Sequence, residues 1–221
     1  ADSGSQAAFL ASEGILPAGK ISVIGHGSLA GVDMERFDPD LQTTEMKREI
    51  RQNLGIAPTS TLLVFVGRIS PDKGMAELID AFRGLLSAGY DVDLLLVGPH
   101  DRERGGISVF DLDDALQCPR IHYLGYAPQP EKYLAISDIF CLPSYREGFG
   151  TVVIEAAAMG LPTVGTAIYG LTDAVADGET GLLVPPRDAR ALEAAFRRML
   201  DRPEERARMG QAARCRCFEF F

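Results

Sequence analysis

The sequence lacks the features that mark several protein classes. No apolar run approaches the roughly 18 residues that a membrane-spanning helix needs. The first residues, beginning with Ala1, contain neither the basic region nor the apolar core of a signal peptide. The four cysteines form no C-x-x-C pair, and no histidines are paired at metal-ligand spacing. We therefore expect a cytoplasmic protein with reduced thiols and no bound metal.

Positive charge is also in the minority. Of the 221 residues, 22 are Lys or Arg and 31 are Asp or Glu, so the net charge is -9. Because an acidic chain repels the phosphate backbone of nucleic acids, DNA and RNA are not expected partners. With 46% hydrophobic and 24% charged residues, and without repeats or low-complexity segments, the composition is that of a globular domain.

Short β-rich segments alternate with helical patterns from residue 20 onward. Most of these segments are continuous apolar runs, which are typical of strands buried on both faces of a parallel sheet. The expected strands comprise residues 21–24, 61–66, 92–97, 120–124, 139–142, 162–165 and 181–184. The expected helices comprise residues 44–54, 75–86, 109–116, 130–135, 151–159 and 192–200.

This alternation predicts an α/β fold with a doubly wound parallel sheet of the Rossmann-like type. In such a sheet ligands bind beyond the carboxyl ends of the strands, so functional residues are expected in the loops that follow the strands. We assign residues 20–221 to this domain. Residues 1–19 fit the pattern poorly and are expected to be the end of a preceding element. The aromatic C-terminus is expected to lie inside a longer polypeptide.

The loop after the expected strand at 61–66 contains two cations. Gly67 permits a tight exit from the strand, and Arg68 and Lys73 follow just before a helix that starts near Met75. Two positive side chains beside the positive end of a helix dipole form an anion site that suits a diphosphate. The alternative interpretation is an exposed loop with two ordinary surface charges.

A second loop, after the expected strand at 139–142, combines glycines with acidic residues. Gly148 and Gly150 let backbone N–H groups approach a ligand closely, and Glu147 is placed to contact sugar hydroxyls. Glu155 follows in an apolar segment, where a carboxylate is costly unless it is hydrogen-bonded. Because a ribose diol offers two donors, Glu155 is predicted to hold a ribose. The alternative is a glutamate on the exposed side of an amphipathic helix.

These two loops together resemble the C-terminal, donor-binding domain of retaining GT-B glycosyltransferases (glycosyl transferases group 1). The resemblance is strongest to the bacterial enzymes that build capsule, O-antigen and lipid-linked oligosaccharides. It covers roughly residues 20–215, in order and at the spacing of that family. The motifs that carry it are Gly67-Arg68, Lys73-Gly74, Glu147-Gly148-Phe149-Gly150, Glu155 and the segments 27–33, 96–99, 124–126, 137–140 and 178–184.

The resemblance implies one half of a two-domain GT-B fold. The nucleotide sugar is expected mainly on this half, and the acceptor mainly on an N-terminal domain that the chain lacks. The implied reaction is retaining transfer of a hexose from a nucleoside diphosphate, UDP before GDP, to a growing polysaccharide, O-antigen or lipid-linked oligosaccharide. Contact with the cytoplasmic face of a membrane is expected through the other domain. By itself the fragment is expected to bind the donor without completing transfer.

The family also implies roles for individual residues. Arg68, Lys73 and Glu147 are the expected catalytic residues, because the two cations stabilise charge on the departing phosphate while Glu147 orients the sugar. No metal or other cofactor is implied, since the cations replace it. The expected donor-binding residues are Gly67, Gly125, Tyr126, Gly148, Phe149, Gly150, Thr151 and Glu155, with Gly125 and Tyr126 flanking the base.

Other patterns in the sequence give weaker support to functions other than glycosyl transfer. Residues 25–31 have the spacing G-x-G-x-x-x-G, one residue off the dinucleotide fingerprint. His26 suits a structural role as well as a place in an interdomain cleft. The acidic residues Asp111, Asp113 and Asp114 are typical of a solvated helix face. A sugar-nucleotide epimerase would need an acid–base pair that the sequence does not supply. A non-catalytic sugar-nucleotide-binding module is the other alternative.

Overall fold

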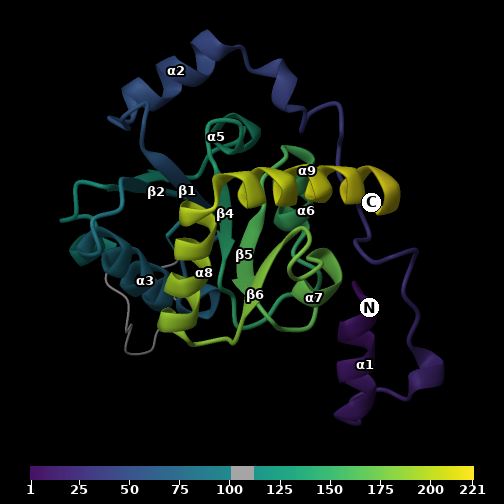
Figure 1. The fold of residues 1–221 in the computed structure, drawn as a ribbon. Helices are drawn as coiled ribbons and strands as arrows, with labels where there is room; N and C mark the ends of the chain where they lie inside the picture. Colours follow the sequence, from purple (N-terminus) through teal and green to yellow (C-terminus); the bar gives the residue numbers. More distant parts are fainter. Residues whose placement is uncertain (101–111) are drawn as a thin grey trace.

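The computed structural model describes residues 1–100 and 112–221, and within them the predicted Rossmann-like α/β fold is confirmed. Its centre is a six-stranded sheet with the order β3-β2-β1-β4-β5-β6, in which every neighbouring pair is parallel (Figure 1). The strands are β1 (Thr61–Val66), β2 (Val92–Val97), β3 (Ile121–Gly125), β4 (Ile139–Leu142), β5 (Thr163–Thr166) and β6 (Gly181–Val184). Because the chain returns from the outer strand β3 to β4 beside β1, the sheet is doubly wound.

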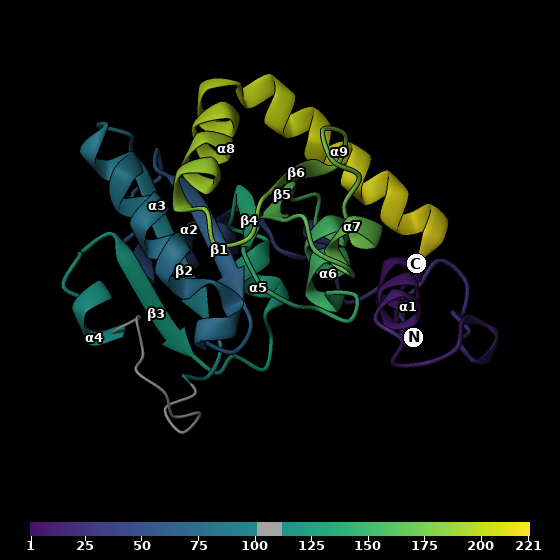
Figure 2. The same cartoon turned by 90° about the horizontal axis from the view of Figure 1, so that it is seen from below.

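Helices cover both faces of this sheet (Figures 1 and 2). α3 (Met75–Ser87) and α8 (Ala189–Asp201) pack against each other on one face. Phe82 and Phe196, one from each helix, are fully buried. α6 (Thr151–Ala158) covers the other face, between α5 (Glu131–Leu134) and α7 (Leu171–Ala174). α9 (Pro203–Phe220) follows α8 and contacts both β6 and α6, so it connects the two faces.

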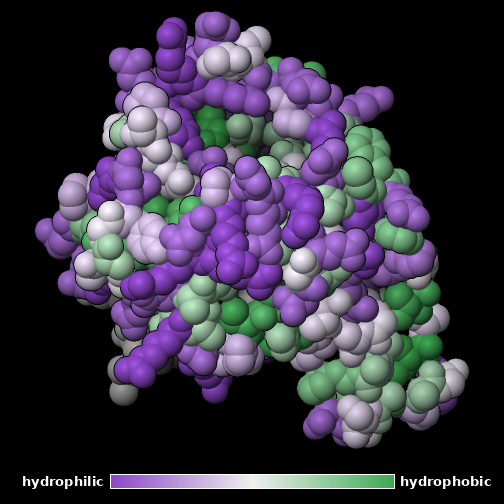
Figure 3. Space-filling view, viewed as in Figure 1, coloured by the Kyte–Doolittle hydropathy of each residue, from purple (hydrophilic) through white to green (hydrophobic). Residues whose placement is uncertain are grey.

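The N-terminal part of the chain lies beside α7. α1 (Gly4–Ser12) is fixed there because the Ser5 amide donates to Asp173 Oδ2 at 3.0 Å and the Gly170 amide donates to Ser5 Oγ at 2.7 Å. Phe9 stacks on Tyr169, with 4.6 Å between ring centroids. Figure 3 shows hydrophobic residues gathered around the region of α1. The exposed large apolar residues of this part of the chain are Phe9, Ile15, Leu16, Ile24 and Leu29.

Further short elements connect these layers. They are α2 (Thr44–Asn53), α4 (Leu112–Ala115) and the 3-10 turns η1 (Ala18–Lys20), η2 (Pro39–Leu41) and η3 (Pro71–Lys73). Of the expected helix at 109–116, only the part that contains α4 is described, because residues 109–111 lie outside the described residues. No helix in the described part of the chain is both long enough and apolar enough to span a bilayer.

One expected strand is wrong. Residues 21–24 form no strand, and Ile24 is 69% exposed. The segment has an apolar sequence, but none of the described strands lies beside it to supply backbone hydrogen bonds. The remaining expected strands are present, with shifts of one residue at β3 and β5.

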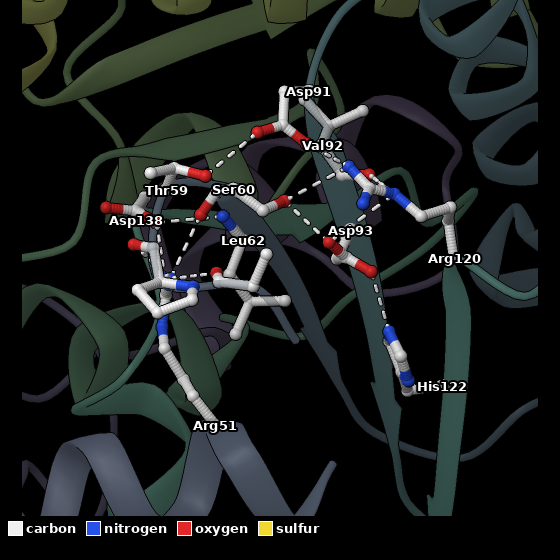
Figure 4. Close-up of polar contacts among 12 residues, drawn as sticks. Arg51, Thr59, Ser60, Leu62, Asp91, Val92, Asp93, Arg120, His122 and Asp138 are labelled. Atoms are coloured by element: carbon white, nitrogen blue, oxygen red, sulfur yellow. Dashed lines mark hydrogen bonds and ion pairs between the residues drawn. The ribbon is translucent and has the colours of Figure 1, made fainter. Parts of the chain in front are cut away.

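A polar network ties the amino ends of the central strands together (Figure 4). The buried carboxylate of Asp93 accepts a hydrogen bond from Ser60 Oγ at 2.5 Å and is hydrogen-bonded to His122 Nε2 at 2.7 Å. At β4, Asp138 pairs with Arg51, with 2.9 Å between Oδ2 and Nη2. Because charge compensation at this edge is internal to the chain, the opposite, carboxyl edge is the place to look for ligand-binding groups.

Candidate donor-binding site

A cavity of about 570 Å³ opens at the carboxyl ends of the neighbouring strands β1 and β4. One wall comes from the loop after β1, and the other from the loop after β4 together with the start of α6. The predicted site residues that line it are Gly67, Arg68, Lys73, Glu147, Gly148, Phe149, Gly150, Thr151 and Glu155. The fold therefore brings together residues that are far apart in the sequence, such as Gly67 and Glu155.

Gly125 and Tyr126 are not among the lining residues. Gly125 ends β3 in the left-handed region, with φ 70°, and its carbonyl accepts a hydrogen bond from the Gly98 amide at 2.7 Å. The Tyr126 side chain is 75% exposed. Their contact with a base stays a prediction, and it would require a ligand that extends from the cavity toward the edge strand.

The two loops pack backbone against backbone. The Tyr145 amide donates to the Asp72 carbonyl at 2.9 Å. Gly74 has φ 68°, and a Cβ at this position would lie 2.1 Å from the Pro143 carbonyl oxygen. Only glycine fits such an approach. The close packing therefore fixes the separation of the loops that carry Lys73 and Glu147.

Tyr145 anchors the loop after β4 to Glu77 and Arg187. Its hydroxyl lies 2.7 and 2.8 Å from the two carboxylate oxygens of Glu77, and the Arg187 guanidinium stacks 4.7 Å from the ring centroid. Burial and the Glu77 carboxylate raise the pKa of Tyr145 to about 12. The phenol therefore remains a proton donor at neutral pH and keeps the loop in place.

Lys73 and Glu147, which the sequence assigns to separate tasks, form an ion pair. Lys73 Nζ lies 2.5 Å from Glu147 Oε1, which also accepts a hydrogen bond from Ser144 Oγ at 2.7 Å. Both side chains are largely buried, with 15% and 14% of their surface exposed. A bound anion would therefore compete with Glu147 for the Lys73 ammonium.

Helix α6 begins at the cavity without a side-chain cap. Its N-cap is Gly150, with φ 82°, and within the described residues it has no side-chain cap hydrogen bond. Gly150, Thr151 and Val152 all line the cavity. The first amides of a helix have no partner within the helix and carry partial positive charge. This edge of the cavity thus suits an anion such as a phosphate.

Glu155 lies on the next turn of α6 between the buried residues Ile154 and Ala156. No residue in the described part of the chain donates a hydrogen bond to its carboxylate or pairs with it. Burial raises the pKa of Glu155 above its usual value, Arg36 opposes this effect and Glu131 adds to it. The carboxylate is thus an acceptor that faces the cavity with its hydrogen-bonding capacity unused by these residues.

Asp2 and residues 28–30 also line the cavity, although none of them is among the predicted site residues. The Asp2 amide donates to Gln6 Oε1 at 2.8 Å, and its carbonyl accepts from the Ser28 amide at 2.9 Å. A Cβ on Gly148 would lie 2.4 Å from Asp2 Oδ2. Nothing in the local pattern of residues 1–19 indicates this long-range contact.

Neither His26 nor His122 lines the cavity. His26 packs edge-on against Phe220, with ring centroids 4.6 Å apart, and His122 belongs to the network at the amino edge. Within residues 1–100 and 112–221 no group of three or more His, Cys, Asp or Glu side chains is arranged to hold a metal ion. That donor binding needs no metal stays a prediction.

Comparison with protein families gives a match over most of the chain. The family described as "Glycosyl transferases group 1" matches residues 46–216. The capsular polysaccharide biosynthesis glycosyltransferase CapM of Staphylococcus aureus is 33% identical over 197 residues, which cover 89% of this chain and 50% of CapM. A D-inositol 3-phosphate glycosyltransferase of Corynebacterium glutamicum is 35% identical over 203 residues, covering 88% of this chain and 46% of that protein. The chain thus spans about half the length of these relatives.

Solved structures share the fold. HepE of Anabaena, described in complex with UDP and in complex with UDP-glucose, superposes with a TM-score of 0.85 at 23% identity. The superposition covers 100% of this chain and 58% of HepE.

Proposed function

Because the chain belongs to the glycosyl transferases group 1 family, we propose that it is the donor-binding domain of a retaining hexosyltransferase. In this proposal the cavity binds a nucleoside diphosphate sugar, with UDP as the first choice of nucleotide. The acceptor is a growing glycan of the capsule, O-antigen or lipid-linked type. The name of the relative CapM supports this choice of glycan. The four free cysteines agree with a reaction in the cytoplasm.

The observation that carries the proposal is the distribution of charge in one cavity. Arg68, Lys73 and the uncapped start of α6 supply positive groups, whereas Glu155 supplies an acceptor on the next turn of the same helix. A diphosphate joined to a ribose presents the complementary groups, anionic oxygens followed by two hydroxyl donors. The description of HepE in complex with UDP and with UDP-glucose supports the same class of ligand.

The Lys73–Glu147 pair suggests how donor binding prepares the site. When a diphosphate draws the Lys73 ammonium toward its oxygens, Glu147 Oε1 loses one of its two partners. The released acceptor can then orient a sugar hydroxyl. As the bond between the sugar and the phosphate breaks, Arg68 and Lys73 stabilise the charge that develops on the departing oxygen, which is commonly a large part of catalysis. We assign no covalent nucleophile.

Transfer itself would need a second domain, which binds the acceptor. The chain spans about half the length of its relatives. The exposed apolar residues of its N-terminal part, among them Phe9 and Leu29, suit contact with such a domain. By itself the chain would bind the donor without transferring the sugar, and in that respect it would behave as the non-catalytic module that is the alternative function.

Calorimetry with UDP and uridine tests the proposal. Arg68→Ala and Lys73→Ala should each weaken UDP binding much more than uridine binding, because both substitutions remove charge from the phosphate half of the site. Arg198→Ala is the control, since Arg198 lies on α8 and pairs with Glu205 rather than lining the cavity. Equal losses for UDP and uridine would overturn the phosphate assignment. A chain that binds neither ligand would overturn the proposed function.

A further inference from the structure

Arg36 links two segments that are far apart in the sequence. Its position is fixed on one side by Asp33, whose Oδ1 accepts from the Arg36 amide at 3.1 Å, and by the neighbouring core residue Phe37. The guanidinium stacks 5.1 Å from the Phe37 ring centroid. Its Nε and Nη2 reach Glu131 Oε2 at 3.1 and 2.8 Å, and Nη2 also donates to the Pro128 carbonyl at 3.0 Å.

The segment that Arg36 holds follows an edge strand. β3 is the outer strand of the sheet, so the loop between β3 and α5 has a neighbouring strand on one side only. This loop carries Tyr126 and ends at Glu131, the first residue of α5, which is 8% exposed. A buried carboxylate without a partner is costly, and the forked guanidinium is the group that satisfies it here. Arg36 therefore ties the loop after β3 and the start of α5 to the segment that contains Asp33 and Phe37.

The same pair of charges acts on Glu155. The positive charge of Arg36 lowers the pKa of Glu155, and the negative charge of Glu131 raises it. Among the described residues, the other charged groups that line the cavity with Glu155 are Asp2, Arg68, Lys73 and Glu147. As long as Arg36 is paired with Glu131, the two opposite charges offset each other beside Glu155. Loss of Arg36 alone would leave Glu131 to favour the protonated form of Glu155.

We propose that Arg36 is a positioning residue for the nucleoside half of the donor site: it fixes the loop after β3 and compensates Glu131, so that an ionised Glu155 is presented to the ribose. This inference rests on the proposed function, because it assumes that a nucleoside diphosphate binds at Glu155. Arg36 itself is not required to touch the ligand.

The test is the pH dependence of UDP affinity. Binding should weaken as the pH falls, because Glu155 and the terminal phosphate of UDP, whose second pKa is about 6, both take up protons. The phosphate contribution is the same for every variant, so the difference between variants reports on Glu155. In Arg36→Met, affinity at pH 7 should fall by at most about tenfold, the size of one lost charge-assisted interaction, and the decline in affinity at acid pH (the acid limb) should move to higher pH. Glu131→Gln should move the limb to lower pH. The double substitution should return the limb toward its wild-type position.

Two further variants show whether an effect comes from the charge of Arg36, from the geometry of its guanidinium or from general destabilisation of the fold. Arg36→Lys keeps the charge without the fork, so the limb should stay in place although affinity falls. Arg198→Met is the matched control, because the Arg198 and Arg36 side chains are both 43% exposed and both ion-paired; it should change neither affinity nor limb. Inorganic pyrophosphate would occupy only the phosphate part of the cavity, at Arg68, Lys73 and the start of α6, so its binding should be the same in Arg36→Met and in the wild type.

The outcomes distinguish this inference from the proposed function. A wild-type chain that binds no UDP contradicts the proposed function itself. If the wild type binds UDP but Arg36→Met lowers affinity without moving the limb, or lowers pyrophosphate binding equally, Arg36 is only a structural residue and the inference is wrong. A double variant with the same pH profile as Arg36→Met would overturn it as well.

Discussion

At the scale of single residues, Lys73 and Glu155 differ in how the chain compensates their charges. Lys73 has Glu147 at 2.5 Å, whereas the Glu155 carboxylate has no hydrogen bond or ion pair within the described residues. A partly buried carboxylate in this state gains more from a ligand that donates hydrogen bonds than an exposed one does, because water solvates it poorly. Glu155 is therefore the residue whose substitution tests the ribose contact most directly.

Glu155→Gln keeps the shape of the side chain and removes its charge. Hydrogen bonds to a charged group contribute roughly 1.5–3 kcal/mol, compared with ~1 for neutral ones. The variant should therefore bind UDP about tenfold more weakly, since tenfold corresponds to ~1.4 kcal/mol. Calorimetry at pH 7 measures the change, and circular dichroism checks that the fold is retained.

A ligand without the diol provides the complementary control. The wild type should bind 2′,3′-dideoxy-UDP weakly, and Glu155→Gln should discriminate less between the two nucleotides. If the wild type binds both equally well, Glu155 does not hold the ribose. A Glu155 that interacts only with water would tolerate glutamine without any change in affinity.

At the scale of secondary-structure elements, the two edges of the sheet differ in chemistry. At the amino edge, Asp93 on β2 is 1% exposed and is compensated within the chain by Ser60, Arg120 and His122 (Figure 4). Burial alone would raise the pKa of Asp93, but the hydrogen bonds from His122 and Ser60 and the nearby Arg120 together hold the pKa below its usual value. The amino edge is therefore expected to stabilise the fold rather than to bind a ligand.

Asp93→Asn should destabilise the chain at pH 7 by about 1–3 kcal/mol, the cost of weakening a buried charged hydrogen-bond network. Because the folded-state pKa of Asp93 is lowered, its stabilising contribution is fully present above the unfolded-state pKa of about 3.9 and is lost as the pH falls through the folded-state pKa. Urea unfolding of wild type and variant should therefore give a difference in stability that shrinks as the pH falls below about 4. A difference that stays constant down to pH 3 would contradict this account.

The elements that the sequence predicts well are those that one local pattern determines. β1, β2, β4 and β6 coincide with the expected apolar runs, and α3 begins at the expected Met75. Residues 21–24 show the same apolar pattern, but strand formation there also needs a neighbouring strand. α9 was not expected, because its buried residues Met209, Gly210, Ala213 and Cys217 are mostly small and form no conspicuous apolar stripe.

The sequence predicts most residues of the site, but it does not predict which of them contact each other. The loops after β1 and β4 were each recognised as ligand-binding candidates from their own glycines and charges. The ion pair between Lys73 and Glu147 joins residues 74 positions apart and depends on β1 lying next to β4. The place of Asp2 in the cavity likewise depends on how the N-terminal segment packs, which no local pattern specifies.

At the scale of the whole molecule, the acidic chain brings two cations and a helix start into one cavity, which the carboxylates of Asp2, Glu147 and Glu155 also line. The net charge is -9, and yet Arg68, Lys73 and the start of α6 meet in a single cavity. Long-range repulsion of an anionic ligand is screened within about 8–10 Å at physiological ionic strength. The local groups therefore dominate once a nucleotide approaches. In the proposed function, these side-chain cations and amides would supply the positive charge that a metal ion supplies in other phosphate sites.

UDP should therefore stabilise the whole chain, and a chelator should leave this effect unchanged. At a concentration of about 100 times its Kd, a ligand that binds only the folded state stabilises it by about 2.7 kcal/mol. For a chain of this size each kcal/mol corresponds to roughly 2–4 °C, so the Tm should rise by about 5–11 °C. A thermal melt with UDP, repeated in EDTA and again with added Mg²⁺ or Mn²⁺, measures this rise in Tm. Uridine at the same concentration should raise the Tm less, because it lacks the diphosphate. If EDTA abolishes the shift and a divalent cation restores it, the cavity binds its donor through a metal, and the assignment of the phosphate charge to Arg68 and Lys73 alone is wrong.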